Sequence, residues 1–146
     1  MRATTEHGEQ RRASLQRSTH QGCIVCRSAQ SNGFGMQFHA TAEGSVEGAF
    51  ACDPFFQGYD GMLHGGVITA ILDGAMTHCL FAHGKSGVTA RLIVRFLQPV
   101  AIERPARIKA WLCDCSPPLY VLEAELFQDG EIMTRATAKF IDRNQI

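Results

Sequence analysis

The stretch 63-LHGGVITAILDGAMTHCLF-81 decides the fold, because its apolar residues extend around most of a helical cylinder. A helix of this kind is buried over most of its surface. The sequence therefore predicts one long buried helix that begins near His64 and ends at Phe81, shortly before a glycine. Two features are unusual in a buried helix: it opens with His64-Gly65-Gly66, and it carries one carboxylate, Asp73.

Strand patterns lie on both sides of this helix. Six segments alternate between apolar and other residues, as half-buried strands do. They cover residues 34–40, 46–52, 89–96, 107–112, 120–127 and 132–140. The first two are expected to form a hairpin, and Asp129-Gly130 predicts a tight turn between the last two. Two strands, one long helix and four strands, without a βαβ rhythm, indicate an α+β fold with an antiparallel sheet of about six strands.

One face of the predicted sheet is basic. Along the later strands, the basic residues fall on the side away from the helix, namely Arg91, Arg95, Arg107, Lys109, Arg135 and Lys139. One helix covers only one face of a sheet, so we expect solvent or a partner subunit on the basic face.

Composition sets the class of protein. The 146 residues are 45% hydrophobic and 19% charged, with a formal net charge of zero. These values fit one globular domain and argue against nucleic acid or an anionic membrane as the main partner. No apolar run reaches the length of a membrane span, and the N-terminus lacks the apolar core of a secretory signal. We therefore expect a cytoplasmic protein with a flexible N-terminal arm over residues 1–21 and one domain over 22–146.

Asp73 lies in a polar stripe with Thr69 and Thr77, at a spacing of four residues on the helix. One interpretation is that this stripe simply faces water. The other is that Asp73 is partly buried and is either held by the neighbouring threonines or kept for chemistry, because a buried ionised carboxylate is costly without a partner. Gly74 favours the second interpretation. Glycine costs a helix about 1 kcal/mol relative to alanine, which suggests a close contact with the backbone there.

Gly65 and Gly66 stand where a helix has backbone N–H groups without internal acceptors. These groups carry the positive end of the helix dipole, and a ligand can reach them because the two residues have no side chains. The start of the helix is therefore a candidate site for an anion or for the developing oxyanion of an acyl transfer. The alternative is that the two glycines only form a tight corner between loop and helix.

The spacing of Gly65 and Asp73 predicts how such a site is assembled. Eight residues of helix span about 12 Å, whereas a base and an oxyanion donor must each lie within about 3 Å of the reacting group. One helix therefore cannot offer both groups to one substrate. Two antiparallel helices related by a two-fold axis would place Asp73 of one subunit near Gly65 of the other, so we expect an obligate homodimer with two shared sites.

The sequence resembles the hotdog-fold acyl-CoA thioesterases of the hydroxybenzoyl-CoA thioesterase and PaaI-like superfamily. The resemblance covers roughly residues 22–142 and rests on GMLHGGV at 61–67, LD at 72–73, TA at 89–90 and VRFLQPV at 94–100. It implies an antiparallel sheet wrapped around a central helix, and dimers or dimers of dimers. It also implies hydrolysis of an acyl-CoA thioester to the free acid and CoA.

The resemblance further implies roles for single residues. Asp73 would be the nucleophile or the general base, the Gly65 N–H would polarise the thioester carbonyl, and His64 would shape the turn. Thr89 falls where the family often has a hydroxyl residue that helps to hold the acid or the attacking water. Gln57 lies near the position of a family Asn or Gln before the His-Gly-Gly phrase, and with Gly66 and Thr89 it completes the expected substrate-binding set.

Cys23 and Cys26 form a Cys-x-x-Cys pair, with His20 and His39 nearby in the sequence. A single pair is weak evidence of a zinc site when no second pair follows at a suitable spacing. Because no secretion signal precedes them, we expect the six cysteines to be reduced. The expectation is an enzyme without metal or cofactor.

Two rival functions remain on such a fold. A non-hydrolytic acyl-CoA-binding module or sensor would keep the glycine-rich turn but would not need Asp73. An acyl hydratase would need a histidine and an acid poised for proton transfer, and the usual phrase of that branch is absent. The acyl group, aliphatic or aromatic, depends on the shape of a pocket that the sequence does not specify.

Overall fold

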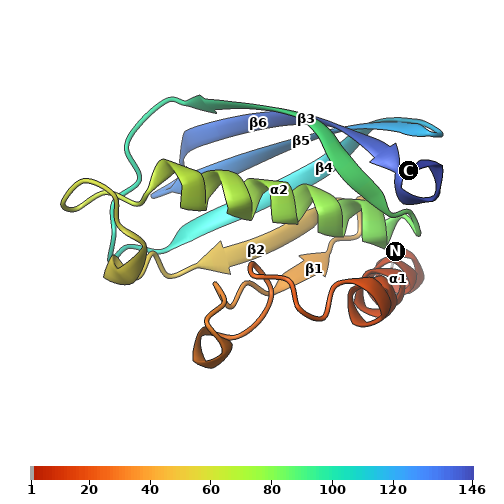
Figure 1. Cartoon of the computed structure of the whole chain (residues 1–146), viewed down its shortest axis with the longest axis horizontal. Coiled ribbons are helices and arrows are strands. Elements are labelled where there is room, and N and C mark those ends of the chain that lie inside the picture. Colours follow the sequence, from red (N-terminus) through yellow and green to blue (C-terminus); the bar gives the residue numbers. More distant parts are fainter. Residues whose placement is uncertain (1) are drawn as a thin grey trace.

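The computed structural model describes residues 2–146. Six strands and two long helices form one α+β unit, in the order that the sequence predicts apart from an additional first helix (Figure 1). The long elements are α1 (Arg2–Thr19), β1 (Phe38–Ala40), β2 (Val46–Phe50), α2 (Gly65–Ala82), β3 (Gly87–Phe96), β4 (Ala106–Ser116), β5 (Leu119–Gln128) and β6 (Glu131–Asp142). Three short 3-10 turns lie at Ala29–Ser31, Pro54–Phe56 and Arg143–Gln145.

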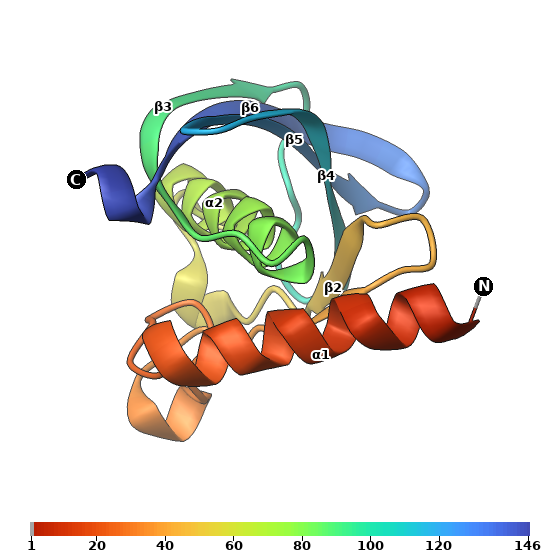
Figure 2. The ribbon, with the colours of Figure 1, turned by 90° about the vertical axis from the view of Figure 1, so that its right-hand side faces the viewer.

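The strands form one antiparallel sheet in the order β1-β2-β4-β5-β6-β3, and the sheet curls around α2 (Figure 2). The predicted hairpin of the first two strands is present, with His39 opposite Glu47. At the turn between β5 and β6, Asp129 and Gly130 have φ values of 52° and 78°. Two successive positive φ values are typical of the type I′ turn that matches the twist of a hairpin. The α+β prediction and the hotdog arrangement of sheet and helix are therefore confirmed.

The core lies between α2 and the concave face of the sheet. On the helix, Ile71, Leu72, Met76 and Leu80 are fully buried. The sheet contributes buried inward residues from β2, β4, β5 and β6, among them Val46, Ile108, Leu122, Leu126 and Phe140. Burial of one such side chain is worth about 1.5–3 kcal/mol, so α2 is held mainly by its apolar surface. By length and hydropathy α2 also passes as a membrane span, but here it is the buried core helix of the domain.

The N-terminal segment, which the sequence analysis expects to be a flexible arm, is helical over most of its length. Helix α1 lies across the end of α2 on the side that the sheet leaves open (Figure 2). Charged side chains make several of its contacts: Arg11 Nε donates to the Ala82 carbonyl at 2.9 Å, and Glu9 Oε2 accepts the Ala40 N–H at 2.7 Å. Arg12 is only 7% exposed. Apolar periodicity does not reveal a helix that docks through charged side chains, which is why the sequence pattern missed it.

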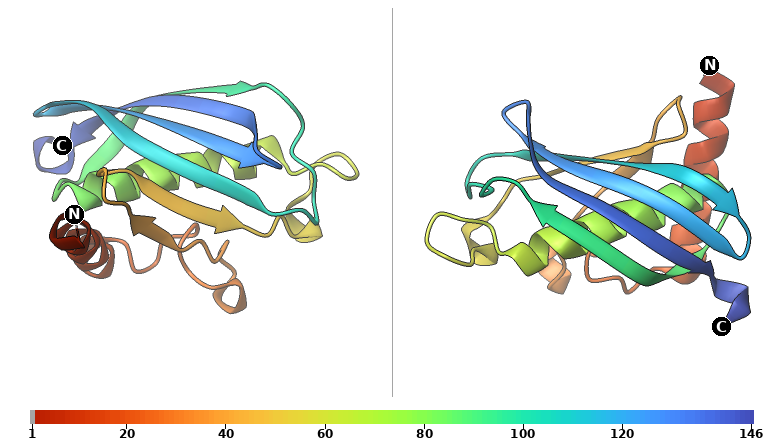
Figure 3. Two further views of the ribbon diagram at one scale, coloured as in Figure 1. Left: turned by 180° about the vertical axis from the view of Figure 1, so that it is seen from behind. Right: turned by 90° about the horizontal axis from the view of Figure 1, so that it is seen from above.

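The convex face of the sheet carries the basic side chains that the sequence places there. Arg91, Arg95, Arg107 and Arg135 are exposed. Seen from above, no other element of the described chain lies over strands β3 to β6 (Figure 3). Strand β3 is an edge of the sheet, so one side of its backbone has no neighbouring strand within the chain.

Candidate active site

The start of α2 is a capped helix terminus with one free amide. His64 is the N-cap, with φ −63° and ψ 131°, and its Nδ1 accepts the Gly66 N–H at 2.9 Å. The Leu63 N–H donates to the Val100 carbonyl and the His64 N–H to the Phe56 carbonyl, which fixes the chain as it enters the helix. Among the described residues, no group accepts a hydrogen bond from the Gly65 N–H. The Gly65 N–H is therefore unused within the described part of the chain, whereas the amide of Gly66 donates to His64.

A cavity of about 720 Å³ opens beside this terminus. Its wall is mostly apolar and includes Tyr59, Met62, Gly65, Phe96 and Pro99. Phe96 lies close to Gly65, because a Cβ added at Gly65 would meet the phenyl ring at 3.5 Å. A volume of this size suits a small organic ligand. Gly65, whose amide has no acceptor among the described residues, thus lines a space that can hold a small organic ligand.

Asp73 lies half-buried on α2, and Thr89 of β3 holds it. Thr89 Oγ1 donates to Asp73 Oδ1 at 2.6 Å. Burial raises the pKa of Asp73 above its ordinary value, while the Thr89 hydrogen bond works against that rise. Two more distant charges also act, because Cys23 raises this pKa and His20 lowers it. A carboxylate with a raised pKa, held by one hydroxyl, has the features of a catalytic acid or base.

The threonines of the helix stripe do not hold the carboxylate. Thr69 Oγ1 donates to the Gly65 carbonyl at 2.8 Å and Thr77 Oγ1 to the Asp73 carbonyl at 3.0 Å, so both hydroxyls bond to helix backbone. The partner from β3 depends on an irregularity, because the pairing of β3 with β6 shifts register between Thr89 and Arg91. Bulges of this kind re-aim a side chain. Simple alternation would have placed Thr89 on the outer face together with Arg91.

Gly74 has the close neighbour that its position in the helix suggests. A Cβ at Gly74 would lie 2.9 Å from Val25 Cγ1, which is too close for an ordinary contact. Val25 is 5% exposed and belongs to the turn between Cys23 and Cys26. The absence of a side chain at Gly74 thus lets this turn pack directly on the helix, next to Asp73.

Gln57 is placed differently from the other predicted residues. Its side chain is exposed, and its Oε1 accepts the Gly61 N–H at 3.2 Å, which closes the loop before α2. Gly58 and Tyr59, but not Gln57, line the cavity. Within one chain, Asp73 lies two helical turns away from Gly65, at about 12 Å along the axis. The structure therefore brings Asp73 together with Thr89, and brings Gly65, Gly66 and His64 together at the helix start.

A buried polar cluster behind Asp73 was not predicted from the sequence. His78 is 1% exposed, although its place in the sequence suggests the helix edge. Arg12 Nη1 lies 3.1 Å from His78 Nδ1, and Cys26 Sγ lies 3.0 Å from His78 Nε2. Burial lowers the pKa of His78 to about 3, so the imidazole is neutral. Nδ1 accepts from the guanidinium, and Nε2–H then donates to the Cys26 sulfur. The partners come from α1 and its following turn, which is why helix periodicity gave no signal.

Cys23 lies beside Cys26 in the same turn, and the pKa values of the two thiols shift in opposite directions. The Cys26 thiol is the main group that lowers the pKa of Cys23, with further contributions from His20 and two backbone amides. The same pairing, together with burial, raises the pKa of Cys26. Cys23 is therefore the thiolate of the pair.

Known proteins share both a sequence family and a fold with this chain. A model of the thioesterase superfamily matches residues 60–132, which include the start of α2, Asp73 and Thr89. No curated protein matches the sequence. The fold is similar to that of the E. coli PaaI protein from the phenylacetic acid degradation operon, with a TM-score of 0.79 and 14% identity over 95% of both chains.

Two further solved structures share the fold. A proposed thioesterase related to phenylacetic acid degradation, from Ralstonia eutropha JMP134, has a TM-score of 0.71 and 25% identity, covering 90% of this chain and 98% of its own. A hypothetical thioesterase from Streptococcus pneumoniae TIGR4, solved with coenzyme A, has a TM-score of 0.69 and 17% identity, covering 74% and 88%.

Proposed function

Because the chain belongs to the thioesterase superfamily, we propose that it hydrolyses an acyl-CoA thioester to the free acid and CoA. The observation that carries this proposal is the pairing of Asp73 with Thr89 at 2.6 Å, on the helix whose first residue, Gly65, lines the cavity. The two neighbouring helix threonines bond to backbone, so among the described residues Thr89 is the side chain that holds the acid.

In the proposed reaction, the Gly65 N–H donates to the thioester carbonyl oxygen and stabilises the negative charge that develops there. Asp73 either takes a proton from the attacking water or attacks the carbonyl carbon itself to form an acyl-enzyme anhydride that water then cleaves. In both routes the C–S bond breaks, the CoA sulfur leaves as a thiolate that takes up a proton, and one water is consumed. Thr89 orients the carboxylate, and His64 holds the turn.

Each site is proposed to take its two groups from different subunits. Asp73 and Gly65 of one chain are too far apart to act on one carbonyl. The long edge of the sheet offers a way to assemble a dimer, because β3 is unpaired on one side and exposes Val88, Ile93 and Phe96. Pairing of two β3 edges about a two-fold axis would set the α2 helices of the two subunits side by side and antiparallel.

The relatives support CoA as the carrier of the acyl group. The S. pneumoniae structure holds coenzyme A, and a protein of similar fold from Streptococcus mutans UA159 is bound to acetyl-CoA. In one further S. pneumoniae structure a threonine has been replaced by alanine, and in another an aspartate has been replaced by alanine. Along that sequence the two positions are as many residues apart as Asp73 and Thr89 are in this chain. We place the enzyme in the cytoplasm, where its six thiols would stay reduced.

The first test is Asp73→Asn, assayed by thiol release from acetyl-, hexanoyl- and benzoyl-CoA. We expect kcat/KM to fall by at least about 100-fold, as when an acid–base group is removed, while the melting temperature and oligomeric state stay close to wild type. Near-normal turnover by this variant would exclude the mechanism. The rival acyl-CoA-binding module predicts binding of the thioesters with no thiol release by the wild-type protein.

The shared site is tested with a pair of variants at Gly65. Gly65 is the first helical residue, and the residue before it has ψ 131°, so proline fits this position without breaking the helix. Gly65→Pro removes the N–H, and we expect about 10²–10³-fold lower kcat. Gly65→Ala keeps the N–H and has room for its Cβ, so it serves as the matched control.

Mixing the two inactive variants separates a shared site from a site within one chain. A heterodimer of Asp73→Asn and Gly65→Pro subunits has one doubly damaged site and one intact site. We expect subunit exchange to restore up to half of the wild-type activity per heterodimer. If both groups acted within one chain, every mixture would remain inactive.

A further inference from the structure

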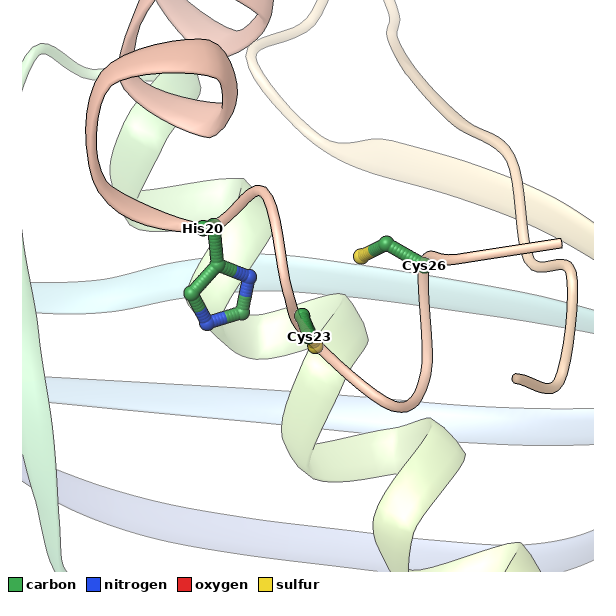
Figure 4. Close-up of side chains that lie close together, drawn as sticks. All are labelled: His20, Cys23 and Cys26. Atoms are coloured by element: carbon green, nitrogen blue, oxygen red, sulfur yellow. The ribbon is translucent and has the colours of Figure 1, made fainter. Parts of the chain in front are cut away.

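A cluster of three metal-ligating side chains lies at the end of α1, outside the groups used for hydrolysis. His20, Cys23 and Cys26 offer one ring nitrogen and two sulfurs, and these three atoms lie within 4.8 Å of one another (Figure 4). Figure 4 shows all three side chains grouped around one small space beside α2. Each residue is half-buried, so the space is sheltered but open enough for an ion to enter.

The backbone of this segment brings the three side chains together. The Cys23 N–H donates to the His20 carbonyl, and the Cys23 carbonyl accepts from the N–H groups of Cys26 and Arg27. Two successive tight turns therefore give the spacing His-x-x-Cys-x-x-Cys, and short Cys-x-x-Cys turns are common in zinc sites. The turn is also fixed from outside, because Val25 packs on Gly74.

A second observation points to a missing ligand. His20 Nδ1 is buried and has no hydrogen-bond partner among the described residues. A buried nitrogen without a partner is unusual and costs free energy. The ring is held in place by edge contacts with Phe81 and His78, at centroid distances of 5.4 and 5.9 Å. A cation bound at this nitrogen would supply the missing partner.

We propose that His20, Cys23 and Cys26 form a binding site for zinc or a similar soft divalent cation. Two thiolates and an imidazole are the donor set that Zn²⁺ prefers, and two thiolates neutralise its charge. Ligand atoms of a tetrahedral zinc ion lie about 3.5–3.8 Å apart. The three atoms lie within 4.8 Å of one another, so the most distant pair has to approach by at most about 1 Å. Water would take the fourth coordination position of the ion. This proposal differs from the sequence analysis, which expects a protein without metal.

His78 and Arg12 form the outer support of this site. Cys26 Sγ and His78 Nε2 lie 3.0 Å apart and form a hydrogen bond. Two ligand atoms of one zinc ion would lie farther apart, so His78 is not counted among the ligands. Arg12 holds the other nitrogen of His78, and Glu9 pairs with Arg12, which keeps the guanidinium charge balanced. Hydrogen bonds of this kind to ligand atoms orient them and tune the metal. His39, the other histidine near the pair in sequence, is exposed on β1 and stays outside the cluster.

The test is metal binding by the full chain, purified without a histidine tag, reduced and freed of metal with a chelator. Zinc is titrated against a chromophoric chelator, and cobalt is added separately to record the thiolate-to-cobalt charge-transfer absorption. We expect one ion per chain and a cobalt spectrum of a tetrahedral site with two thiolates. Cys23→Ser and Cys26→Ser should each remove one thiolate from this spectrum, and His20→Gln should weaken zinc binding.

The matched control is the double variant Cys113→Ser/Cys115→Ser, which removes an exposed pair of thiols elsewhere in the chain. It should bind zinc like the wild type, while His78→Phe should lower the affinity about 10–100-fold. The proposal is overturned if the reduced wild type binds no ion at equimolar zinc, or if the control variant loses the site. The readout uses no substrate, so it stands apart from the test of hydrolysis.

Discussion

Single residues explain how Asp73 is tuned. Its carboxylate is half-buried on α2, and only Thr89 donates a side-chain hydrogen bond to it among the described residues. Burial raises its pKa, and the hydroxyl opposes that rise. In the proposed mechanism Asp73 must be ionised to act, so we expect activity to be lost as the pH falls through this pKa. The acid limb of the pH–rate profile would then report how well Thr89 holds the carboxylate.

Thr89→Val is expected to move this acid limb of kcat/KM to higher pH. The variant loses the hydrogen bond that favours the ionised acid, and hydrogen bonds to charged groups contribute about 1.5–3 kcal/mol. His20 and Cys23, the other groups that act on Asp73, are unchanged. Thr89→Ser keeps the hydroxyl and should leave the profile in place. A limb that stays fixed in Thr89→Val would mean that another group controls it.

The sequence identifies Asp73 but not its partner. The interruption of an apolar helix by one acid is visible in the letters, and so is the unusual Gly74. The hydroxyl that holds the acid depends on a register shift between Thr89 and Arg91. Such a shift arises from pairing with β6, and the alternation within β3 alone contains no sign of it. The resemblance to known thioesterases, rather than periodicity, was the source of the Thr89 prediction.

At the scale of elements, α2 is positioned by close contacts on both sides. The sheet packs on one side, and on the other the turn at Val25 touches the bare backbone of Gly74. The periodic segments α2 and β3 to β6 were predictable, because each buries a regular apolar face. Helix α1 was not, because Glu9, Arg11 and Arg12 dock it through hydrogen bonds. The burial of His78 beside Arg12 was hidden for the same reason, whereas His20 and the Cys23–Cys26 pair already stand close together in the sequence.

Gly74→Ala tests this packing by urea unfolding. Its Cβ would meet Val25 Cγ1 at 2.9 Å, and overpacking costs about 1–3 kcal/mol, which outweighs the gain of about 1 kcal/mol in helix propensity. We expect net destabilisation by about 1 kcal/mol. In a Val25→Ala background the clash is absent, so Gly74→Ala should become stabilising. Equal effects of Gly74→Ala in both backgrounds would show that the contact has no energetic role.

At the scale of the whole molecule, the exposed edge at β3 is the feature that a single chain leaves incomplete. Ile93 is 47% exposed and Phe96 54% exposed on an edge strand of ten residues. Long apolar edges tend to pair with another strand. The need for a second subunit was argued from the spacing of Gly65 and Asp73 alone. The sequence alone could not suggest where a second subunit would dock, because it does not reveal that β3 is an edge strand.

If the proposed dimer pairs through β3, Ile93→Glu is expected to weaken it and to reduce activity in parallel. The substitution places a charge on the apolar edge of each subunit, where burial in an interface would be costly. Sedimentation velocity over a range of concentrations measures the monomer fraction, and thiol release is followed in the same samples. Val121→Glu is the control, because it places the same charge on the central strand β5, away from the edge. It should not convert the proposed dimer into monomers. An active monomer of Ile93→Glu would exclude a site shared across this edge.

The strand order has a consequence for the course of folding. Strands β4, β5 and β6 follow one another in the chain and pair as neighbours, joined by short turns such as Asp129-Gly130. Strand β3 reaches β6 only by closing a long loop, because Val94 pairs with Ala136. Local pairings form faster than distant ones. We therefore expect the three-stranded meander of β4, β5 and β6 to form early and β3 to join late. Until β3 joins, β6 is unpaired on one side, and we expect newly made chains to be prone to self-association through that edge. Association through β3 would have to wait for this last strand.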